Sequence, residues 1–134
     1  MTDTTAVLQA YLLASGSLRT YLGGDYVSTP VAPKGWTNTH KAIIFHAETE
    51  TAHITRADNA TTFTFKCYGG SASFEDARAC YHALVDYLHN ARGQATAHGR
   101  IKLARLITAF DGPPEPETGW PVMVAKFEIA TEDL

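Results

Sequence analysis

Residues Thr61–Leu88 read TTFTFKCYGGSASFEDARACYHALVDYL, a strand pattern that runs directly into a helix pattern. In the first eight positions Phe63, Phe65 and Cys67 alternate with polar side chains. An alternation of period two is typical of a strand with one buried face. The pair Gly69-Gly70 follows, and glycines at this place indicate that the strand ends in a turn.

A helix is predicted to begin directly after that turn. Ser73 stands three residues before Asp76, a spacing that resembles a capping box. From there to about Asn90, apolar residues recur every three or four positions, as on the buried face of an amphipathic helix. The residues of this expected face are Phe74, Ala77, Cys80, Tyr81, Leu84, Val85 and Leu88.

Towards the N-terminus, the run Ala42–Ala47, AIIFHA, predicts a short strand buried on both faces, because it is apolar and rich in β-branched residues. A first helix is predicted before it, capped by Asp3 or Thr4 and broken at Ser15-Gly16-Ser17. Its apolar residues are Val7, Leu8, Tyr11, Leu12 and Leu18. Residues 25–41 contain two prolines and many small polar residues, which indicates a long loop.

Towards the C-terminus, apolar residues in 101–110 and 122–129 predict a second pair of strands. The proline- and glycine-rich residues 111–121 between them cannot form a strand. The expected order is therefore helix, strand, strand, helix, strand, strand. We expect an α+β fold with an antiparallel or mixed four-stranded sheet packed against two helices, in a single domain over residues 1–134.

Composition narrows the classes of function. The 134 residues are 45% hydrophobic and carry a formal net charge of −3, so the chain can bury a core but is a poor candidate for gripping nucleic acid. No run approaches the roughly 18 apolar residues of a membrane span, and the polar start Met1–Thr5 does not resemble a secretory signal. Cys67 and Cys80 both fall on expected apolar faces, so we expect reduced thiols and a cytosolic site of synthesis.

Side chains that could do chemistry are present, but their context is weak. His82, Asp86 and His89 share one helix face and could hold a divalent ion, yet no HExxH motif accompanies them and the face reads as solvated. Cys67 lies on the apolar side of its strand, where a thiol is inert. The glycine pairs lack a phosphate-binding pattern. We expect no catalytic, cofactor-binding or metal-binding residue.

Contacts with other protein copies are the more plausible use of the loops. Trp36 and Trp120 stand beside Gly and Pro, where an aromatic residue either covers a core edge or anchors a partner. The polar stretch Glu48–Ala60 is either a flexible hairpin tip or an arm that reaches a neighbour, and Asp111–Pro121 is a second such loop. The candidate interface residues are Trp36, Glu48, Glu50, Ile54, Arg56, Asp58, Asp111, Glu115, Glu117 and Trp120.

Several segments in this order resemble a known family. They are AIIFH from Ala42, FTFKCYG from Phe63, SFEDARA from Ser73, ALVDYL from Ala83 and GRIKL from Gly99. With the polar stretch after the first strand and the closing strand, they resemble the tail-terminator, or tail-completion, proteins of tailed bacteriophages and of phage-derived gene-transfer particles. These are also described as head-tail joining proteins. The resemblance covers residues from about Val7 to Ala130.

The resemblance implies a structural virion protein and no enzyme. Copies of the chain would form a ring, usually a hexamer, that caps the tail tube and ends its polymerisation. One face would meet the tail-tube protein and the other the head-completion or stopper protein, at the head-tail junction, after synthesis in the host cytoplasm. Double-stranded DNA would pass through the lumen unbound, and the mild negative charge of each copy suits such a lumen. No cofactor and no membrane is implied.

Three alternatives stay open from the sequence. The chain could be another neck or tail-tube subunit, such as a stopper or an adaptor. It could be a small metal-dependent enzyme that uses His82, Asp86 and His89. It could also be a cytosolic ligand-binding domain, which predicts a monomer with an apolar pocket.

Overall fold

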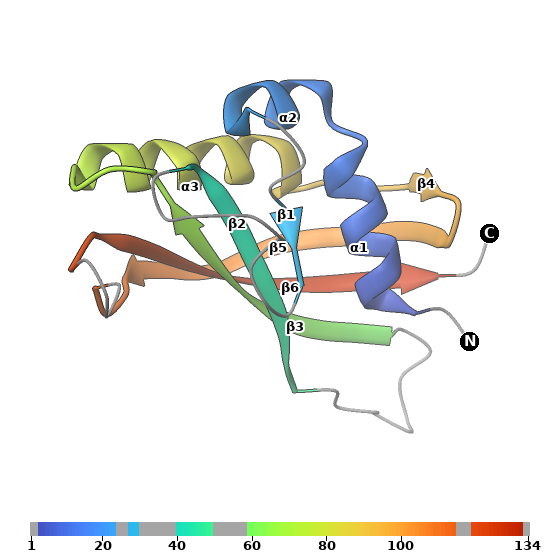
Figure 1. Ribbon diagram of the computed structural model, residues 1–134. Coiled ribbons are helices and arrows are strands. Elements are labelled where there is room, and N and C mark those ends of the chain that lie inside the picture. Colours follow the sequence, from blue (N-terminus) through green and yellow to red (C-terminus); the bar gives the residue numbers. More distant parts are fainter. Residues whose placement is uncertain (1–2, 24–26, 30–39, 50–58, 115–118, 133–134) are drawn as a thin grey trace.

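The computed structural model describes residues 3–23, 27–29, 40–49, 59–114 and 119–132. Within these residues the chain forms three helices and one six-stranded sheet with the strand order β1-β2-β3-β6-β5-β4 (Figure 1). The elements are α1 (Thr4–Leu13), α2 (Gly16–Leu22), β1 (Val27–Ser28), β2 (Ala42–Thr49), β3 (Asn59–Tyr68), α3 (Phe74–Leu88), β4 (Gln94–Thr96), β5 (Gly99–Asp111) and β6 (Val122–Glu132).

The predicted fold class, with four strands and two helices in the order α-β-β-α-β-β, is wrong. A third helix, α2, and two short strands, β1 and β4, are present. The extra helix arises because Ser15 caps a new helix where the first one breaks, its hydroxyl accepting the Leu18 N–H at 3.1 Å. The extra strands have two and three residues, which is too short for any alternation to show in sequence.

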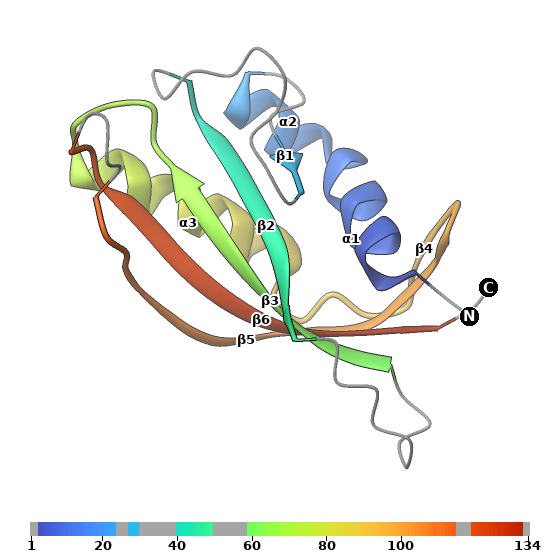
Figure 2. The ribbon, with the colours of Figure 1, turned by 60° about the horizontal axis from the view of Figure 1, so that its bottom comes forward.

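The long strands pair in antiparallel fashion. β2 pairs with β3, β3 with β6 and β6 with β5, so one rung of the sheet runs through Phe45, Phe65, Ala125 and Ala109. β1 adds a parallel contact to β2 at its outer edge. Register shifts after Ile101 and Leu106 mark irregularities in β5, and the long strands are strongly curved (Figure 2).

All three helices lie on the same side of the sheet, and the core fills the space between (Figures 1 and 2). Four phenylalanines from three neighbouring strands are fully buried at its centre: Phe45, Phe63, Phe65 and Phe127. The rings of Phe65 and Phe127 meet edge to face with their centroids 5.3 Å apart. The predicted inward side of β3, made of Phe63, Phe65 and Cys67, is confirmed.

The connection from β3 to α3 differs from the sequence prediction in its cap. Ser73 is the N-cap residue of α3 but its side chain makes no capping hydrogen bond. Instead the Ser71 hydroxyl donates to the Asp76 carboxylate and accepts the Ser73 N–H at 3.0 Å. Gly69 is required here, because a Cβ at this position would collide with the backbone of Asp76 and Ala77.

Two further features concern the cap of α1 and the length and polarity of the helices. The predicted cap of the first helix is confirmed, since the Asp3 carboxylate accepts the Ala6 N–H at 3.2 Å. None of the helices in the described ranges is both long enough and apolar enough to span a membrane.

Candidate functional site

The helices are locked together by a reciprocal pair of tyrosines. The Tyr11 hydroxyl donates to the Tyr87 carbonyl at 3.1 Å, and the Tyr87 hydroxyl donates to the Tyr11 carbonyl at 2.9 Å. Their rings stack with centroids 4.5 Å apart. Each carbonyl lies in the last turn of its helix, where the backbone has no intrahelical partner, so each tyrosine caps the other helix. The pair therefore serves the fold.

Burial of these two tyrosines also perturbs their titration. Burial, the nearby Tyr87 and the hydrogen bond with it raise the pKa of Tyr11 from 10.0 to about 12. Burial likewise raises the pKa of Tyr87, although its hydrogen bonds to Tyr11 and Ser15 oppose the shift. Both groups stay protonated through the neutral range and carry no charge for chemistry.

The two cysteines are free, fully buried and adjacent. A hydrogen bond to the Cys80 thiol, burial and the electrostatic effect of Cys80 together raise the pKa of Cys67 well above its usual value. The Cys80 thiol in turn donates to the Ala42 carbonyl at 3.7 Å. The expectation that both cysteines lie on apolar faces is confirmed. A thiol with a raised pKa and no access to solvent is a poor nucleophile.

The histidine face of α3 does not converge on one point. His89 turns towards β5, where its Nδ1 accepts the Leu106 N–H at 3.1 Å. His82 and Asp86 are both exposed. Over the described ranges, no three His, Cys, Asp or Glu side chains come close enough to hold a metal ion.

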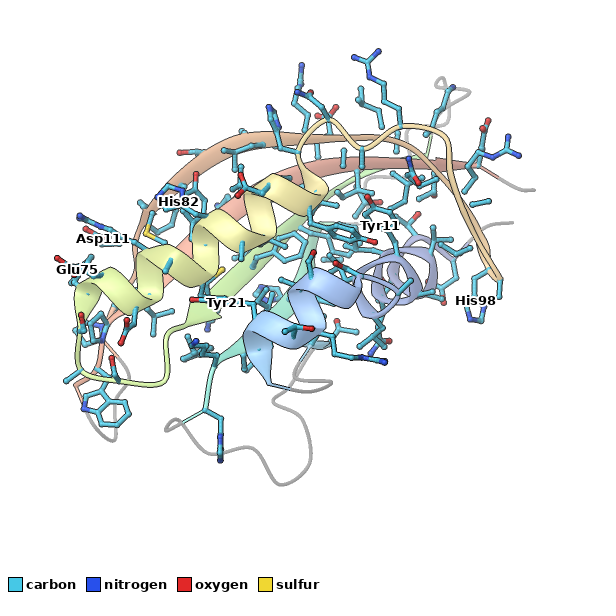
Figure 3. All side chains as sticks on the ribbon, turned by 90° about the horizontal axis from the view of Figure 1, so that it is seen from above. Tyr11, Tyr21, Glu75, His82, His98 and Asp111 are labelled. Carbon is cyan, nitrogen blue, oxygen red and sulfur yellow. The ribbon has the colours of Figure 1, made fainter. Side chains whose placement is uncertain are left out.

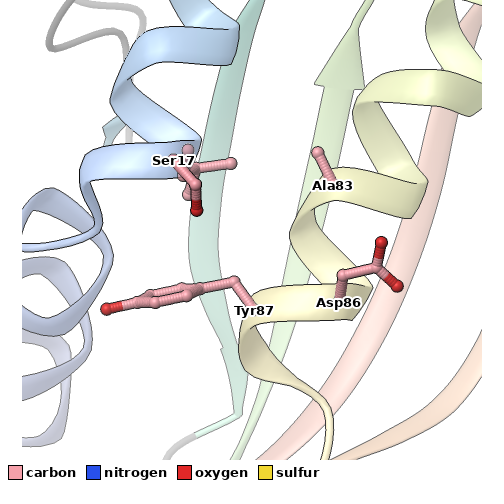
Figure 4. Close-up of a pocket in the computed structure, with 5 residues that line it drawn as sticks. Ser17, Ala83, Asp86 and Tyr87 are labelled. Atoms are coloured by element: carbon pink, nitrogen blue, oxygen red, sulfur yellow. The ribbon is translucent and has the colours of Figure 1, made fainter.

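A shallow hollow lies between α2 and α3 (Figure 4). Its volume is about 260 Å³, and its lining includes Ser17, Leu18, Ala83, Asp86 and Tyr87. Ligand pockets usually measure roughly 300–1,000 Å³ and are mostly apolar. This hollow is smaller, and its lining includes the polar side chains of Ser17 and Asp86, so it does not resemble the apolar pocket that a ligand-binding domain would require.

The outer edge of β5 and the first half of α3 carry the three exposed large apolar side chains of the described residues: Phe74 at 40%, Ile107 at 49% and Phe110 at 44% exposure. Phe110 stands between Ala109 and Asp111, which face the helices, so its side chain is on the opposite face of the sheet from Phe74. Ile107 and Phe110 lie on the same strand edge, and exposed apolar side chains on a sheet edge are candidates for contact with another chain. We call this region, formed by Phe74, Arg78 and residues 107–111, the β5 edge surface.

An arginine joins the two parts of the β5 edge surface. The Arg78 guanidinium lies 4.8 Å from the centre of the Phe74 ring, and one of its nitrogens is 3.7 Å from the Asp111 carboxylate. The side chains of Arg78 and Asp111 are 57% and 48% exposed, so water screens the ion pair and it adds little stability. Figure 3, a view from above, shows Asp111 and Tyr21 on opposite sides of α3.

Along the outer edge of β5, the hydrogen-bond partners of the main chain differ from one end of the strand to the other. β4 covers Gly99–Ile101 only, and further on the Ala104 N–H and carbonyl bond to Ala91 and Asn90. Leu106 is covered by His89. Beyond these contacts, no main-chain group in the described part of the chain bonds to the outer side of residues 107–111.

The face of the sheet opposite the helices is polar at the far end of β5 and β6. Arg100 lies 3.4 Å from Glu132 and Arg105 lies 3.7 Å from Glu128, both pairs joining neighbouring strands. These pairs are partly exposed and alternate in sign, so this end of the sheet has no strong charge of one sign. It shows none of the concentrated positive charge that a nucleic-acid surface requires.

The structure places only part of the predicted interface set. Asp111 lies at the end of β5 and the half-buried Trp120 precedes β6, on either side of the same connection. Glu48 is in β2. The other predicted interface residues lie outside the described residues: Trp36, Glu50, Ile54, Arg56, Asp58, Glu115 and Glu117.

Sequence reasoning missed most of the β5 edge surface. Phe74 was expected on the buried face of α3, yet it is exposed, because it begins the helix beyond the end of the core. Ile107 and Phe110 read as strand residues without any sign of which would be exposed. The signal available was the irregular alternation around Arg105–Ile107, where the structure has a register shift.

Comparison with known proteins gives one finding about the fold. The chain is similar to a chain in the solved structure of the virion of a native gene transfer agent (GTA) particle, with a TM-score of 0.66 and 20% sequence identity. The match covers 97% of this chain and 98% of that chain. No protein-family model and no curated protein matches the sequence. At this identity the likeness establishes a shared fold over the full length of both chains.

Proposed function

We propose that this chain is a structural protein of a phage-like particle. It would act as the tail terminator, a ring that caps the tail tube, ends its growth and joins it to the head. The observation that carries the proposal is the match to a chain of a gene transfer agent virion, which covers 97% of this chain and 98% of that chain. A shared fold does not fix a function, so the proposal also rests on the surfaces of this chain.

Two surface features support assembly rather than catalysis. Among the described residues no three His, Cys, Asp or Glu side chains come close enough to hold a metal ion, whereas Ile107 and Phe110 are exposed on a strand edge that no described strand covers. Uncovered edges invite pairing with another chain, and proteins usually protect them. An open edge of this kind is expected in a subunit whose edge strand pairs with another chain once the assembly forms.

The proposed partners follow the same logic. Copies of the chain meet each other around the ring, one face of the ring meets the tail-tube protein, and the other meets the head-completion or stopper protein. DNA passes through the lumen without specific binding, which agrees with a net charge of −3 per copy. The predicted contact residues in the Glu48–Asp58 and Asp111–Trp120 stretches belong to this proposal.

The test uses particles made by a producer strain in which the coding sequence is deleted. Electron microscopy should show headless tails of uncontrolled length, and the intact chain supplied in trans should restore tails of defined length joined to heads. Tails of normal length that remain attached to heads would contradict the terminator role. Uniform tails on heads that leak DNA would favour a stopper instead.

A further inference from the structure

We infer that neighbouring copies join by pairing the open part of β5 in one copy with the open part of β2 in the next. This inference rests on the proposed ring and specifies the contact that forms it. The occupant of the β5 edge is thus a second copy of this chain, bound through a different surface.

The first argument is the unpaired main chain of β5. The Gly112 N–H donates to the Val122 carbonyl at 2.9 Å, so Gly112 faces β6. Main-chain groups of a strand point alternately to its two sides, so those of Asp111 and Ala109 face outwards. Another extended strand matches donors and acceptors arranged in this way, as in strand addition to a sheet edge.

The second argument is that the other side of the sheet has a matching open stretch. β1 covers β2 only at Ile43 and Ile44. On that side no described strand lies beside Phe45–Thr49, but Phe45 is fully buried. Within the described residues, His46–Thr49 of β2 and Ile107–Asp111 of β5 are therefore the stretches that no other strand covers, at opposite sides of the sheet.

The third argument is strand direction. Three successive antiparallel pairings separate β2 from β5, so these two strands run in opposite directions. Copies related by rotation about an axis roughly parallel to the strands keep their strand directions. The β2 strand of one copy therefore meets the β5 strand of the next in antiparallel orientation, which continues the pattern of the sheet. Contacts of this head-to-tail kind can close into a ring.

The fourth argument is that the two open stretches occupy overlapping positions along the strand direction. His46, Thr64, Lys126 and Thr108 form one rung of the sheet. The adjacent rung joins Phe45 to Ala109 through the two central strands. A slip of about two residues, roughly 7 Å along the strands, places His46–Thr49 of one copy fully opposite the open stretch of β5 in the next.

The experiment introduces a thiol on each side of the contact, in the full-length chain. Thr108→Cys and His46→Cys lie on the same rung and therefore on the same face of the sheet. The concentrated double variant is treated with a short bis-maleimide, whose reach covers a slip of two residues. Cys67 and Cys80 are fully buried, and the unchanged chain treated in the same way measures any background from them.

A ladder of covalent dimers, trimers and higher species is expected from the double variant and from neither single variant. A matched control combines Thr108→Cys with Thr62→Cys on the inner strand β3, and no ladder is expected from it. Absence of a ladder from the first double variant overturns the inference, provided that circular dichroism shows a folded chain. A crosslinked dimer from Thr108→Cys alone also overturns it, because β5 would then pair with itself.

Images of the same samples separate this inference from the proposed function. Closed rings without a ladder contradict the edge pairing and leave the terminator role standing. A ladder from open fibres with no closed ring contradicts the ring and leaves the edge pairing standing. Should folding fail in the double variant, Thr108→Cys and His46→Cys chains mixed as separate preparations give the same test, with crosslinked dimers as the expected product.

Discussion

The two halves of β5 are built for different purposes. Its first half is covered on the outer side by β4, Ala91 and His89, and its inward residues Ile101 and Ala104 are fully buried. Its second half has no strand beside it in the described residues and exposes Ile107 and Phe110. One strand thus begins as part of the core and ends as an open edge. If the open half is the contact between copies, as proposed, stability and assembly are separated along the strand, which the following predictions test.

The largest expected effect is a loss of stability from a substitution in the hydrophobic core. Phe65→Ala removes a fully buried ring between Phe45 and Phe127 and leaves a cavity, so it should lower the free energy of unfolding by about 3–5 kcal/mol. Phe110→Ala, at 44% exposure, is the matched control and should cost less than about 1 kcal/mol. Urea unfolding of both variants measures the difference, and equal costs would mean that the edge belongs to the core.

The next effect concerns the hydrogen bond between the Leu106 N–H and His89 in the middle of β5. His89→Ala removes the acceptor of the Leu106 N–H and should cost about 0.5–1.5 kcal/mol of stability. His82→Ala, an exposed histidine on the same helix, should stay within about 0.5 kcal/mol of the unchanged chain. Hydrogen exchange at the Leu106 amide should speed up in the first variant only. The same exchange rate in both would show that His89 does not protect the strand.

A similar cost is expected at the tyrosine pair, with a pH signature. Tyr11→Phe removes one of the two reciprocal caps and should cost about 0.5–1.5 kcal/mol. Because the pKa of Tyr11 is raised in the folded state, its contribution is complete below pH 10 and is lost as the pH rises from 10 to about 12. The stability of Tyr11→Phe should therefore fall less steeply over that range. Identical slopes in urea titrations at several alkaline pH values would contradict this.

The smallest expected change in stability is on the open half of β5, where the change in assembly should be large. Ile107→Lys places a charge on a side chain that is 49% exposed, so stability should stay within about 0.5 kcal/mol. A lysine on an edge strand discourages pairing with another chain, so assembly should be lost. Ala79→Lys adds the same charge on the exposed side of α3 and should assemble normally. Light scattering at high concentration measures both, and unimpaired assembly of Ile107→Lys would exclude the edge from the contact.

The contrast between the two halves also shows what sequence could reveal. β3 and α3 were predictable because their apolar periodicity extends over eight residues or more, as in Phe63, Phe65 and Cys67, and β2 was predictable from the apolar run Ala42–Ala47. The helix α2 was missed because Ser15-Gly16-Ser17 reads as a helix break although Ser15 also caps a new helix. The strands β1 and β4 were missed because two or three residues carry no period and depend on tertiary contacts. The strand order, which places β6 between β3 and β5, likewise depends on contacts distant in sequence.

The site was less predictable than the fold. Trp120 was selected as an aromatic residue beside Gly and Pro, and Asp111 as part of the loop Asp111–Pro121, and the structure places both at the connection from β5 to β6. Phe74, Ile107 and Phe110 were missed because exposure depends on what lies beside a residue in space. Ile107 and Ile101 belong to the same strand, yet one is half-exposed and the other fully buried.

The most direct test of the proposed role is electron cryo-microscopy of intact particles that contain this chain. The account predicts a closed ring of copies at the junction of head and tail, with β2 of each copy beside β5 of the next. Particles with such a junction in which this chain is absent, or is present only as separate copies elsewhere, would contradict it.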